Sequence, residues 1–272
     1  MKFFLSYPRS GNHLIRFITE YITAGYTQGC INNKKDLPLY TNEYSEVNIL
    51  SHVDRHRQVL LKVHSIAEAN FNATAYLTGI ERCMIVLRNP LFCISSHLRN
   101  DAELDSKEFE VKLKNNLDHY NSIYEVSFKN TETTTIWYEE LLGESVSDSL
   151  SAISEFFRDD LVLKRYTELC LNPKLYFDIS SGGKGRSWGG SQSLKDKYHY
   201  ISIMSKENRF IFLNVIRSYL DSKLEETETL KSKYHLLNDS RYGKNINNYL
   251  EELDEIEKHY RSNKFINPFS KS

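Results

Sequence analysis

The sequence has few cysteines, the residues whose disulfide bonds stabilise many secreted proteins, and it lacks the long apolar runs that anchor a protein in a membrane. Its four cysteines, Cys30, Cys83, Cys93 and Cys170, form no C-x-x-C pair, so their spacing indicates neither a disulfide framework nor a zinc site. The chain begins with only about four apolar residues before Ser6, which is too short for a signal peptide or a membrane span. We therefore expect a cytoplasmic protein with no membrane span.

An excess of charge of either sign is also missing, because 35 Lys and Arg residues face 36 Asp and Glu residues. Without a basic field, we expect no binding to nucleic acid or to an anionic membrane, and an anionic ligand must be held by local groups. The 272 residues suffice for one large α/β domain or for two small ones. Because no internal repeat or low-complexity linker divides the chain, we expect a single domain over residues 1–272.

Short apolar runs alternate with helical patterns in the first half of the chain. Buried strands are expected at residues 3–7, 59–63, 83–87 and 133–137. A helix is expected from Asn12, with Gly25 as its C-cap, and another over roughly residues 107–128. Strands that alternate with helices predict an α/β protein with three layers, in which a central, mostly parallel sheet lies between two layers of helices.

The second half of the chain is mostly helical in pattern. A glycine-rich loop at residues 180–190 interrupts it, and we expect a helical extension over about residues 220–272. One apolar stripe marks the last helix and consists of Tyr249, Leu250, Leu253, Ile256 and Tyr260. This stripe either packs on the core of the domain itself or forms the interface of a homodimer.

The first candidate anion site is the turn between the first strand and the first helix, residues 8–13, PRSGNH. A glycine turn at this place directs backbone N–H groups and the positive end of the helix dipole at one point, which suits a phosphate. Arg9 adds a fixed positive charge, and Ser10, Asn12 and His13 add hydrogen-bond donors. The Walker A motif is absent. The same residues also fit an ordinary turn.

Arg88 and Ser96 form the second candidate site. Arg88 is followed by Asn89 and Pro90 at the end of a predicted strand, and Pro90 can open a helix. Ser96, eight residues after Arg88, then falls about two turns into that helix, on a face that can join Arg88 around one anion. Arginine suits bidentate phosphate recognition, although an arginine at a strand end is also common in surface ion pairs.

Lys62 and His64 form the third candidate site, at the end of the second predicted strand. They lie two residues apart and therefore share one face of the sheet. His64 leaves the sheet at its carboxyl edge, where open α/β folds hold their ligands. An imidazole can take a proton from an acceptor hydroxyl at neutral pH. The alternative is a histidine that only satisfies its own hydrogen bonds.

Taken in order, these motifs resemble those of the sulfotransferases that use 3′-phosphoadenosine-5′-phosphosulfate (PAPS). That family has a first loop P-[KR]-[ST]-G-[TS]-[TS]-W, then K-T-H, then R-N-P with a serine eight residues after the arginine. Its Y-E-D-L motif is matched by residues 138–141, and its R-K-G-x-x-G-x-W loop is matched loosely by residues 182–188. The resemblance covers roughly residues 3–190. Asn12 and His13 depart from the family's hydroxyl residues, and Leu14 replaces the tryptophan that stacks on adenine.

The resemblance implies a fold like that of the P-loop nucleotide hydrolases, and it implies roles for individual residues. His64 would be the general base, Arg9 would stabilise charge on the leaving phosphate, and Lys62 would assist at the sulfuryl group. Glu68 is the nearest carboxylate in the sequence and the second candidate for the base. No metal ion is needed. The residues implied in binding PAPS are Arg9, Ser10, Gly11, Asn12, His13, Arg88, Ser96, Tyr138, Lys184 and Gly185.

The expected reaction moves a sulfuryl group from PAPS to a hydroxyl or amine acceptor and releases adenosine 3′,5′-bisphosphate. Polar, Tyr-rich and Asn-rich segments at residues 28–57, 98–110 and 190–205 favour a polar or carbohydrate-like small molecule or a glycan. A small alcohol, a phenol and a peptide tyrosine are alternatives. A nucleotide-dependent phosphotransferase is disfavoured by the missing Walker lysine. A non-catalytic nucleotide-binding protein is the other alternative, and the presence of both Arg9 and His64 argues against it.

Overall fold

The computed structural model describes residues 2–29, 52–65, 82–129, 133–143, 145–172, 175, 198–234 and 241–261. The chain divides into two compact units, the first formed by Met1–Arg88 and Leu117–Gln192 and the second by Asn89–Asn116 and Ser193–Ser272. The single domain expected from the sequence stays a prediction.

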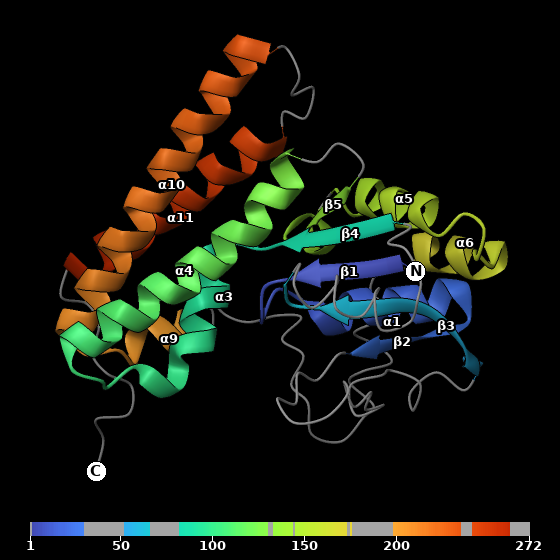
Figure 1. Ribbon diagram of the computed structural model, residues 1–272, viewed down its shortest axis with the longest axis horizontal. Coiled ribbons are helices and arrows are strands. Elements are labelled where there is room, and N and C mark those ends of the chain that lie inside the picture. The colour runs from blue at the N-terminus through green and yellow to red at the C-terminus, as the bar shows by residue number, and fades with distance from the viewer. Residues whose placement is uncertain are drawn as a thin grey trace. The chain divides into compact units, whose positions relative to one another are not determined.

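The elements in chain order are β1 (Lys2–Ser6), α1 (Asn12–Thr23), β2 (Gly25–Gly29), β3 (Asp54–Val63), β4 (Arg82–Leu87), α3 (Pro90–His97), η3 (Leu98–Asp101), α4 (Ser106–Lys129), β5 (Thr134–Trp137), η4 (Glu140–Leu142), α5 (Val146–Phe156), α6 (Leu163–Leu171), α9 (His199–Ser202), α10 (Lys206–Tyr234) and α11 (Arg241–Arg261) (Figure 1).

A five-stranded, all-parallel sheet forms the centre of the first unit. Its strand order is β2-β3-β1-β4-β5, so β1 lies in the middle. Phe3 of β1 is in register with Leu61 of β3 on one side and with Cys83 of β4 on the other. The prediction of an α/β protein with a parallel sheet is confirmed, as are the four strands and the first helix expected from the sequence, with shifted ends.

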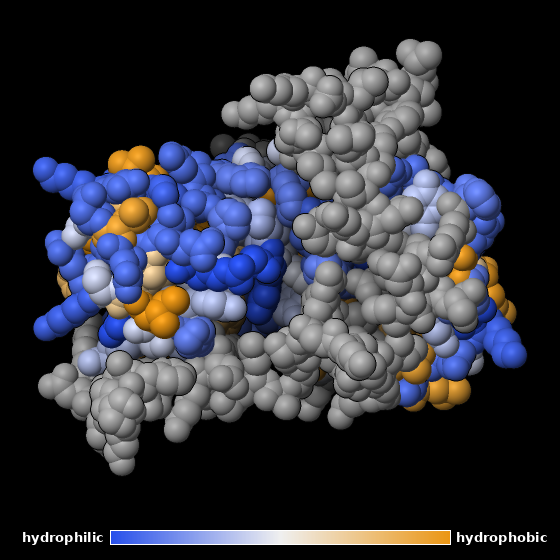
Figure 2. Space-filling view, turned by 90° about the horizontal axis from the view of Figure 1, so that it is seen from below, coloured by the Kyte–Doolittle hydropathy of each residue, from blue (hydrophilic) through white to orange (hydrophobic). Residues whose placement is uncertain are grey.

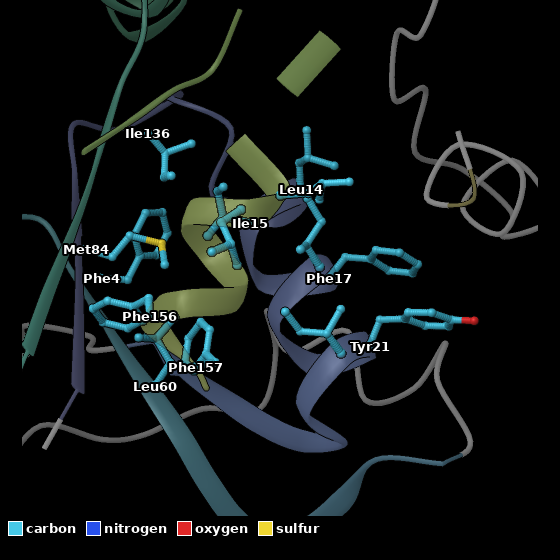
Figure 3. Close-up of a cluster of buried hydrophobic side chains, with 14 of the residues drawn as sticks. Phe4, Leu14, Ile15, Phe17, Tyr21, Leu60, Met84, Ile136, Phe156 and Phe157 are labelled. Atoms are coloured by element: carbon cyan, nitrogen blue, oxygen red, sulfur yellow. The ribbon is translucent and has the colours of Figure 1, made fainter. Parts of the chain in front are cut away.

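One face of the sheet packs against α1 and α5. Alternate strand residues point to this face, and Figure 3 shows their side chains meeting those of the two helices. Full burial of each such apolar side chain contributes roughly 1.5–3 kcal/mol to stability. The residues labelled there are Phe4, Leu14, Ile15, Phe17, Tyr21, Leu60, Met84, Ile136, Phe156 and Phe157.

The opposite face of the sheet is buried as well. Its inward-pointing residues are Phe3, Leu5, Leu61, Val63, Ile85 and Leu87. At the end of β1 on this face, the Tyr7 ring lies edge-on to the rings of His119 and Tyr120, at centroid distances of 5.3 and 5.7 Å. These two residues belong to the part of α4 that is in the first unit. Burial on both faces explains why the strands read as continuous apolar runs.

The C-cap expected for the first helix, Gly25, is wrong. The helix is capped by Ala24, which adopts a left-handed conformation with φ 54° and donates its N–H to the Glu20 carbonyl at 3.0 Å. Gly25 instead begins β2, a strand that the sequence did not predict. A Cβ at Gly25 would lie 2.3 Å from Cγ1 of Val59, so the close pairing of β2 with β3 requires glycine there.

A buried polar network holds β2 against α1. Arg16 donates from Nε to the Thr27 hydroxyl at 2.7 Å and from Nη2 to the Thr27 carbonyl at 2.9 Å. Glu20 accepts from the Thr27 N–H at 2.7 Å and from its hydroxyl at 2.6 Å. All three residues are at most 2% exposed. Because charged hydrogen bonds replace apolar contacts here, a strand forms from a polar sequence.

In the second unit, α3 begins as its sequence predicts. Pro90 is its first residue, and the Asn89 side chain accepts the Leu91 N–H at 3.0 Å as the N-cap. Of the helical extension expected over about residues 220–272, the structure describes 220–234 and 241–261, which are helical in α10 and α11. These two helices are joined by Arg217, which pairs with Asp254 at 2.6 Å and with Glu257 at 2.9 Å. From the predicted stripe, the residues buried within the chain are Tyr249, Leu253 and Ile256.

Figure 2 shows one face of the molecule, on which hydrophobic residues occur in small separate groups among hydrophilic ones. Scattered apolar residues of this kind are ordinary on protein surfaces. No helix in the described ranges combines the length and the apolar character needed to cross a membrane. The most exposed large hydrophobic side chains are Val111, Leu142, Leu163, Leu171, Ile203 and Phe210.

Candidate functional site

The turn that joins β1 to α1 lies at the carboxyl edge of the sheet. The Ser10 N–H closes it by donating to the Tyr7 carbonyl at 3.2 Å. Arg9 and Gly11 both adopt left-handed conformations, with φ values of 67° and 86°. Gly11 is the N-cap of α1, so the N–H groups of the first helical turn are presented at this edge. The strand, glycine turn and helix expected from the sequence are therefore present, and anion binding at this turn stays a prediction.

Tyr138 and Arg88 cover the turn from the ends of β5 and β4. A Cβ at Gly11 would lie 2.1 Å from Cδ2 of Tyr138, so the ring occupies the space that glycine leaves. The Arg88 guanidinium lies over the same ring, 4.5 Å from its centroid, which is a cation–π contact. Arg88 also donates from Nη1 to the Arg9 carbonyl at 2.7 Å. The two strand ends and the turn therefore form one packed unit.

The phenol of Tyr138 keeps its proton at neutral pH. Burial raises its pKa, the Arg88 guanidinium lowers it, and the carboxylate of Glu139 raises it, with a net rise above the ordinary value. A protonated phenol can donate a hydrogen bond to an anion or to a base.

His64 is held in one tautomer at the end of β3. Its Nδ1 lies 2.8 Å from the Ser6 carbonyl, which can only accept, so Nδ1 carries the hydrogen. Its Nε2 contacts Nζ of Lys62. This contact puts Lys62 and His64 on one face, as the sequence predicts, and Nε2 points away from the Ser6 carbonyl.

The hydroxyl of Ser10 is buried in the turn without a hydrogen-bond partner among the described residues. Its side chain is 0% exposed, and its Oγ has no hydrogen-bond partner in the part of the chain that the structure describes. A buried hydroxyl without a partner is costly, and such groups are uncommon in folded proteins. Nearby, a contact between Ser6 Oγ and Asn12 Oδ1 ties the end of β1 to the start of α1. Other buried side chains of the described residues, among them Thr19 and Ser149, also have a hydroxyl without a partner.

The structure places most of the predicted site residues at this one edge of the first unit. They are Arg9, Ser10, Gly11, Asn12, His13, Lys62, His64, Arg88 and Tyr138. Ser96 lies on α3 in the second unit and is partly exposed. Lys184, Gly185 and Glu68 lie outside the described residues. The roles predicted for all of these residues stay predictions.

Two residues of α4 contact the site although no motif marked them. His119 donates from Nε2 to the His64 carbonyl at 2.7 Å. Tyr120 donates its hydroxyl to the Arg88 carbonyl, also at 2.7 Å. The contacts join residues 55 and 32 positions apart in the chain, so only a three-dimensional arrangement reveals them. The sequence carried no more than the amphipathic pattern of the helix.

The sequence matches no protein-family model and no curated protein. Among the residues that the structure describes, no group of three or more His, Cys, Asp or Glu side chains is arranged to hold a metal ion.

Proposed function

We propose that this chain is a sulfotransferase, which moves a sulfuryl group from PAPS to a hydroxyl or amine acceptor. The observation that carries the proposal is the position of the His64 imidazole, oriented by the Ser6 carbonyl, beside the glycine turn at the N-terminus of α1. His64 directly follows β3, the turn follows β1, and Arg88 directly follows β4, so three adjacent strands bring the proposed base and the cations to one edge. Ligands of open parallel sheets bind at this edge.

The proposed binding site for the donor, PAPS, is the turn after β1 together with Tyr138 and Arg88, which cover it. The N–H groups at the start of α1 suit the 5′-phosphate, and the Ser10 hydroxyl gains there the partner that it lacks. Arg9 is exposed at the turn and supplies the charge that a leaving phosphate needs. The resemblance to the sulfotransferases assigns the 3′-phosphate to Arg88 and Ser96, and it assigns a contact with adenine to Tyr138. Within the first unit, Arg9, Ser10 and Arg88 support this donor.

The acceptor side is His64 with Lys62. Bound PAPS supplies the sulfuryl group and its phosphate leaving group. The Ser6 carbonyl keeps the hydrogen on Nδ1, so Nε2 is the atom that takes the proton from the acceptor. Nζ of Lys62 contacts that nitrogen. An anionic sulfuryl group attracts the ammonium, and its movement would free Nε2 for the acceptor.

We include in the same proposal that the fold has three layers, α/β/α, and is of the P-loop type. A parallel sheet whose first strand runs through a glycine turn into a helix, with helical residues over both faces, supports a three-layer α/β/α fold of the P-loop type. In this chain, the phosphate-binding lysine of the Walker A motif is replaced by the arrangement around Arg9. A polar or carbohydrate-like acceptor, the cytoplasmic location and the homodimer stay predictions.

Nucleotide binding tests the proposal before any acceptor is known. Adenosine 3′,5′-bisphosphate should raise the melting temperature more than AMP or ATP at equal concentration, because only the bisphosphate carries the 3′-phosphate. Incubation with PAPS and a panel of sugars, alcohols, phenols and tyrosine peptides should then reveal a sulfated product. A preference for ATP would favour a phosphotransferase. Binding of the bisphosphate without turnover on any acceptor would favour a non-catalytic nucleotide-binding protein.

A further inference from the structure

His119 and Tyr120 of α4 connect the ends of three adjacent strands. The sheet order places β3, β1 and β4 side by side. The first residue after each of these strands is His64, Tyr7 and Arg88 respectively. His119 donates to the carbonyl of His64, and Tyr120 donates to the carbonyl of Arg88, each at 2.7 Å. We name this pair of hydrogen bonds, His119 to His64 and Tyr120 to Arg88, the α4 brace.

The middle strand end is held by ring contacts. The Tyr7 ring lies edge-on to both His119 and Tyr120, at 5.3 and 5.7 Å between centroids. Edge-to-face pairs of this kind contribute about 0.5–1.5 kcal/mol beyond their buried area. Tyr7 and Tyr120 are almost completely buried. One turn of one helix therefore contacts the residue after each of three strands.

The brace acts on the residues that carry the proposed chemistry. His64 has its ring oriented by the Ser6 carbonyl and its own carbonyl fixed by His119, so both ends of the residue are held. Arg88 has its side chain on the Arg9 carbonyl and its own carbonyl fixed by Tyr120. Displacement of a catalytic group by about 1 Å can cost a hundredfold in rate.

From this arrangement we infer that His119 and Tyr120 are positioning residues, one for the proposed base and one for the proposed phosphate-binding arginine. The inference rests on the proposed function for its consequences in catalysis. His119 acts on turnover through His64, and Tyr120 acts on nucleotide affinity through Arg88. The two effects are separable because the two hydrogen bonds end on different strands.

The sequence allows the His119 bond to be observed directly, without any substrate. His64-Ser65 is the only His-Ser pair in the chain. A sample labelled with carbonyl-¹³C histidine and ¹⁵N serine therefore gives a single cross-peak in a carbonyl–amide correlation spectrum, and this peak reports the His64 carbonyl. A donated hydrogen bond deshields a carbonyl carbon, so its loss moves the resonance upfield.

Three variants and one control complete the experiment. His119→Leu removes the donor, His119→Gln places an amide N–H near the position of Nε2, and Tyr120→Phe removes only the hydroxyl. The control is Ser122→Ala, because Ser122 is exposed on the same helix and bonds to the His119 carbonyl within that helix. Melting curves establish that each variant is folded.

We expect His119→Leu to move the His64 carbonyl resonance and to lower kcat by about tenfold to a hundredfold. The affinity for adenosine 3′,5′-bisphosphate should change by less than about twofold, because the hydrogen bond from Tyr120 to the Arg88 carbonyl is kept in this variant. His119→Gln should restore both the resonance and most of the rate. Tyr120→Phe should weaken bisphosphate binding by about threefold to tenfold and leave the resonance in place. The Ser122→Ala control should leave all three quantities as in the wild type.

An unchanged carbonyl resonance in His119→Leu would overturn the brace. The positioning role of His119 would be overturned if the resonance moved in His119→Leu but kcat did not fall. It would also be overturned if His119→Gln restored the resonance but not the rate. If the wild-type protein transfers no sulfuryl group and does not bind the bisphosphate, the proposed function fails. The brace is then judged on the resonance alone, where the same unchanged signal in His119→Leu overturns it.

Discussion

The Arg88 guanidinium lies 4.5 Å from the centroid of the Tyr138 ring, and the same ring fills the space above Gly11. The contact joins the end of β4 to the residue after β5 and to the turn after β1. Arg88 is thereby held at the turn while its charge stays at the edge of the sheet, where the backbone N–H groups of α1 begin.

Arg88→Ala should weaken the binding of adenosine 3′,5′-bisphosphate by about tenfold to a hundredfold, because an arginine bond to a phosphate contributes ~1.5–3 kcal/mol. Isothermal titration calorimetry measures the loss. Arg82→Ala is the matched control, since Arg82 lies at the opposite end of the same strand and bonds to the Phe156 carbonyl. Unchanged affinity in a folded Arg88 variant would remove Arg88 from the site.

Gly11→Ala should destabilise the protein by about 2 kcal/mol or more and abolish bisphosphate binding. The new Cβ would collide with the Tyr138 ring, and the φ of 86° is strained for any residue with a side chain. Urea unfolding measures the stability. Gly143→Ala is the control, because its Cβ would approach only the Glu139 carbonyl, at 3.3 Å, and the two variants should differ clearly. Equal, small effects would show that the ring does not need glycine beneath it.

Asp160 should make the stability of the first unit depend on pH. Burial raises the pKa of its carboxyl, but hydrogen bonds from Lys2 at 2.6 Å and Arg57 at 2.9 Å outweigh this and hold the pKa below its ordinary value. A depressed pKa in the folded state means that the carboxylate stabilises the protein above its unfolded pKa, near 4, and that this contribution is lost as the pH falls through the folded pKa.

The free energy of unfolding of Asp160→Asn should therefore lie about 1–3 kcal/mol below that of the wild type at pH 7, and the difference should shrink toward zero in acid. Chemical denaturation at several pH values measures both curves. Asp159→Asn is the control, because the Asp159 side chain is 68% exposed. A difference between wild type and Asp160→Asn that is the same at every pH would contradict the ion-pair explanation.

Arg9 should matter for turnover more than for binding of the spent nucleotide. Arg9→Ala should lower kcat by ~10²-fold or more, because the charge at the turn serves the leaving oxygen. Arg9→Lys retains the charge, as in the family that the sequence resembles, and should keep most of the rate. An equal loss of product affinity with an unchanged kcat would make Arg9 a plain binding residue.

What the sequence predicts correctly is mostly local. The path from β1 through the turn into α1 follows from the apolar run, the glycine and the helical spacing within about twenty residues. The sequence did not predict β2, because this strand depends on buried hydrogen bonds of Thr27 with Arg16 and Glu20. A polar sequence pattern does not indicate such bonds.

The candidate site shows the same division. The turn, His64 and Arg88 stand directly after strands, so a parallel sheet brings them together once the strands are recognised. His119 and Tyr120 reach these residues from the middle of a long helix, and their contacts depend on how that helix lies on the sheet. Periodicity alone does not determine such a contact.

The most direct test of the central claim compares sulfuryl transfer in His64→Ala with that in the wild type, using PAPS and the acceptor found by screening. A base that takes the acceptor's proton contributes typically 10²–10⁴-fold, so kcat should fall by about that factor. Affinity for adenosine 3′,5′-bisphosphate should stay within about threefold, since His64 serves the acceptor and not the nucleotide. Glu68→Ala is the parallel variant and should retain the activity. Near-wild-type rates in a folded His64→Ala would contradict the account, and a selective loss in Glu68→Ala would assign the role of base to that carboxylate.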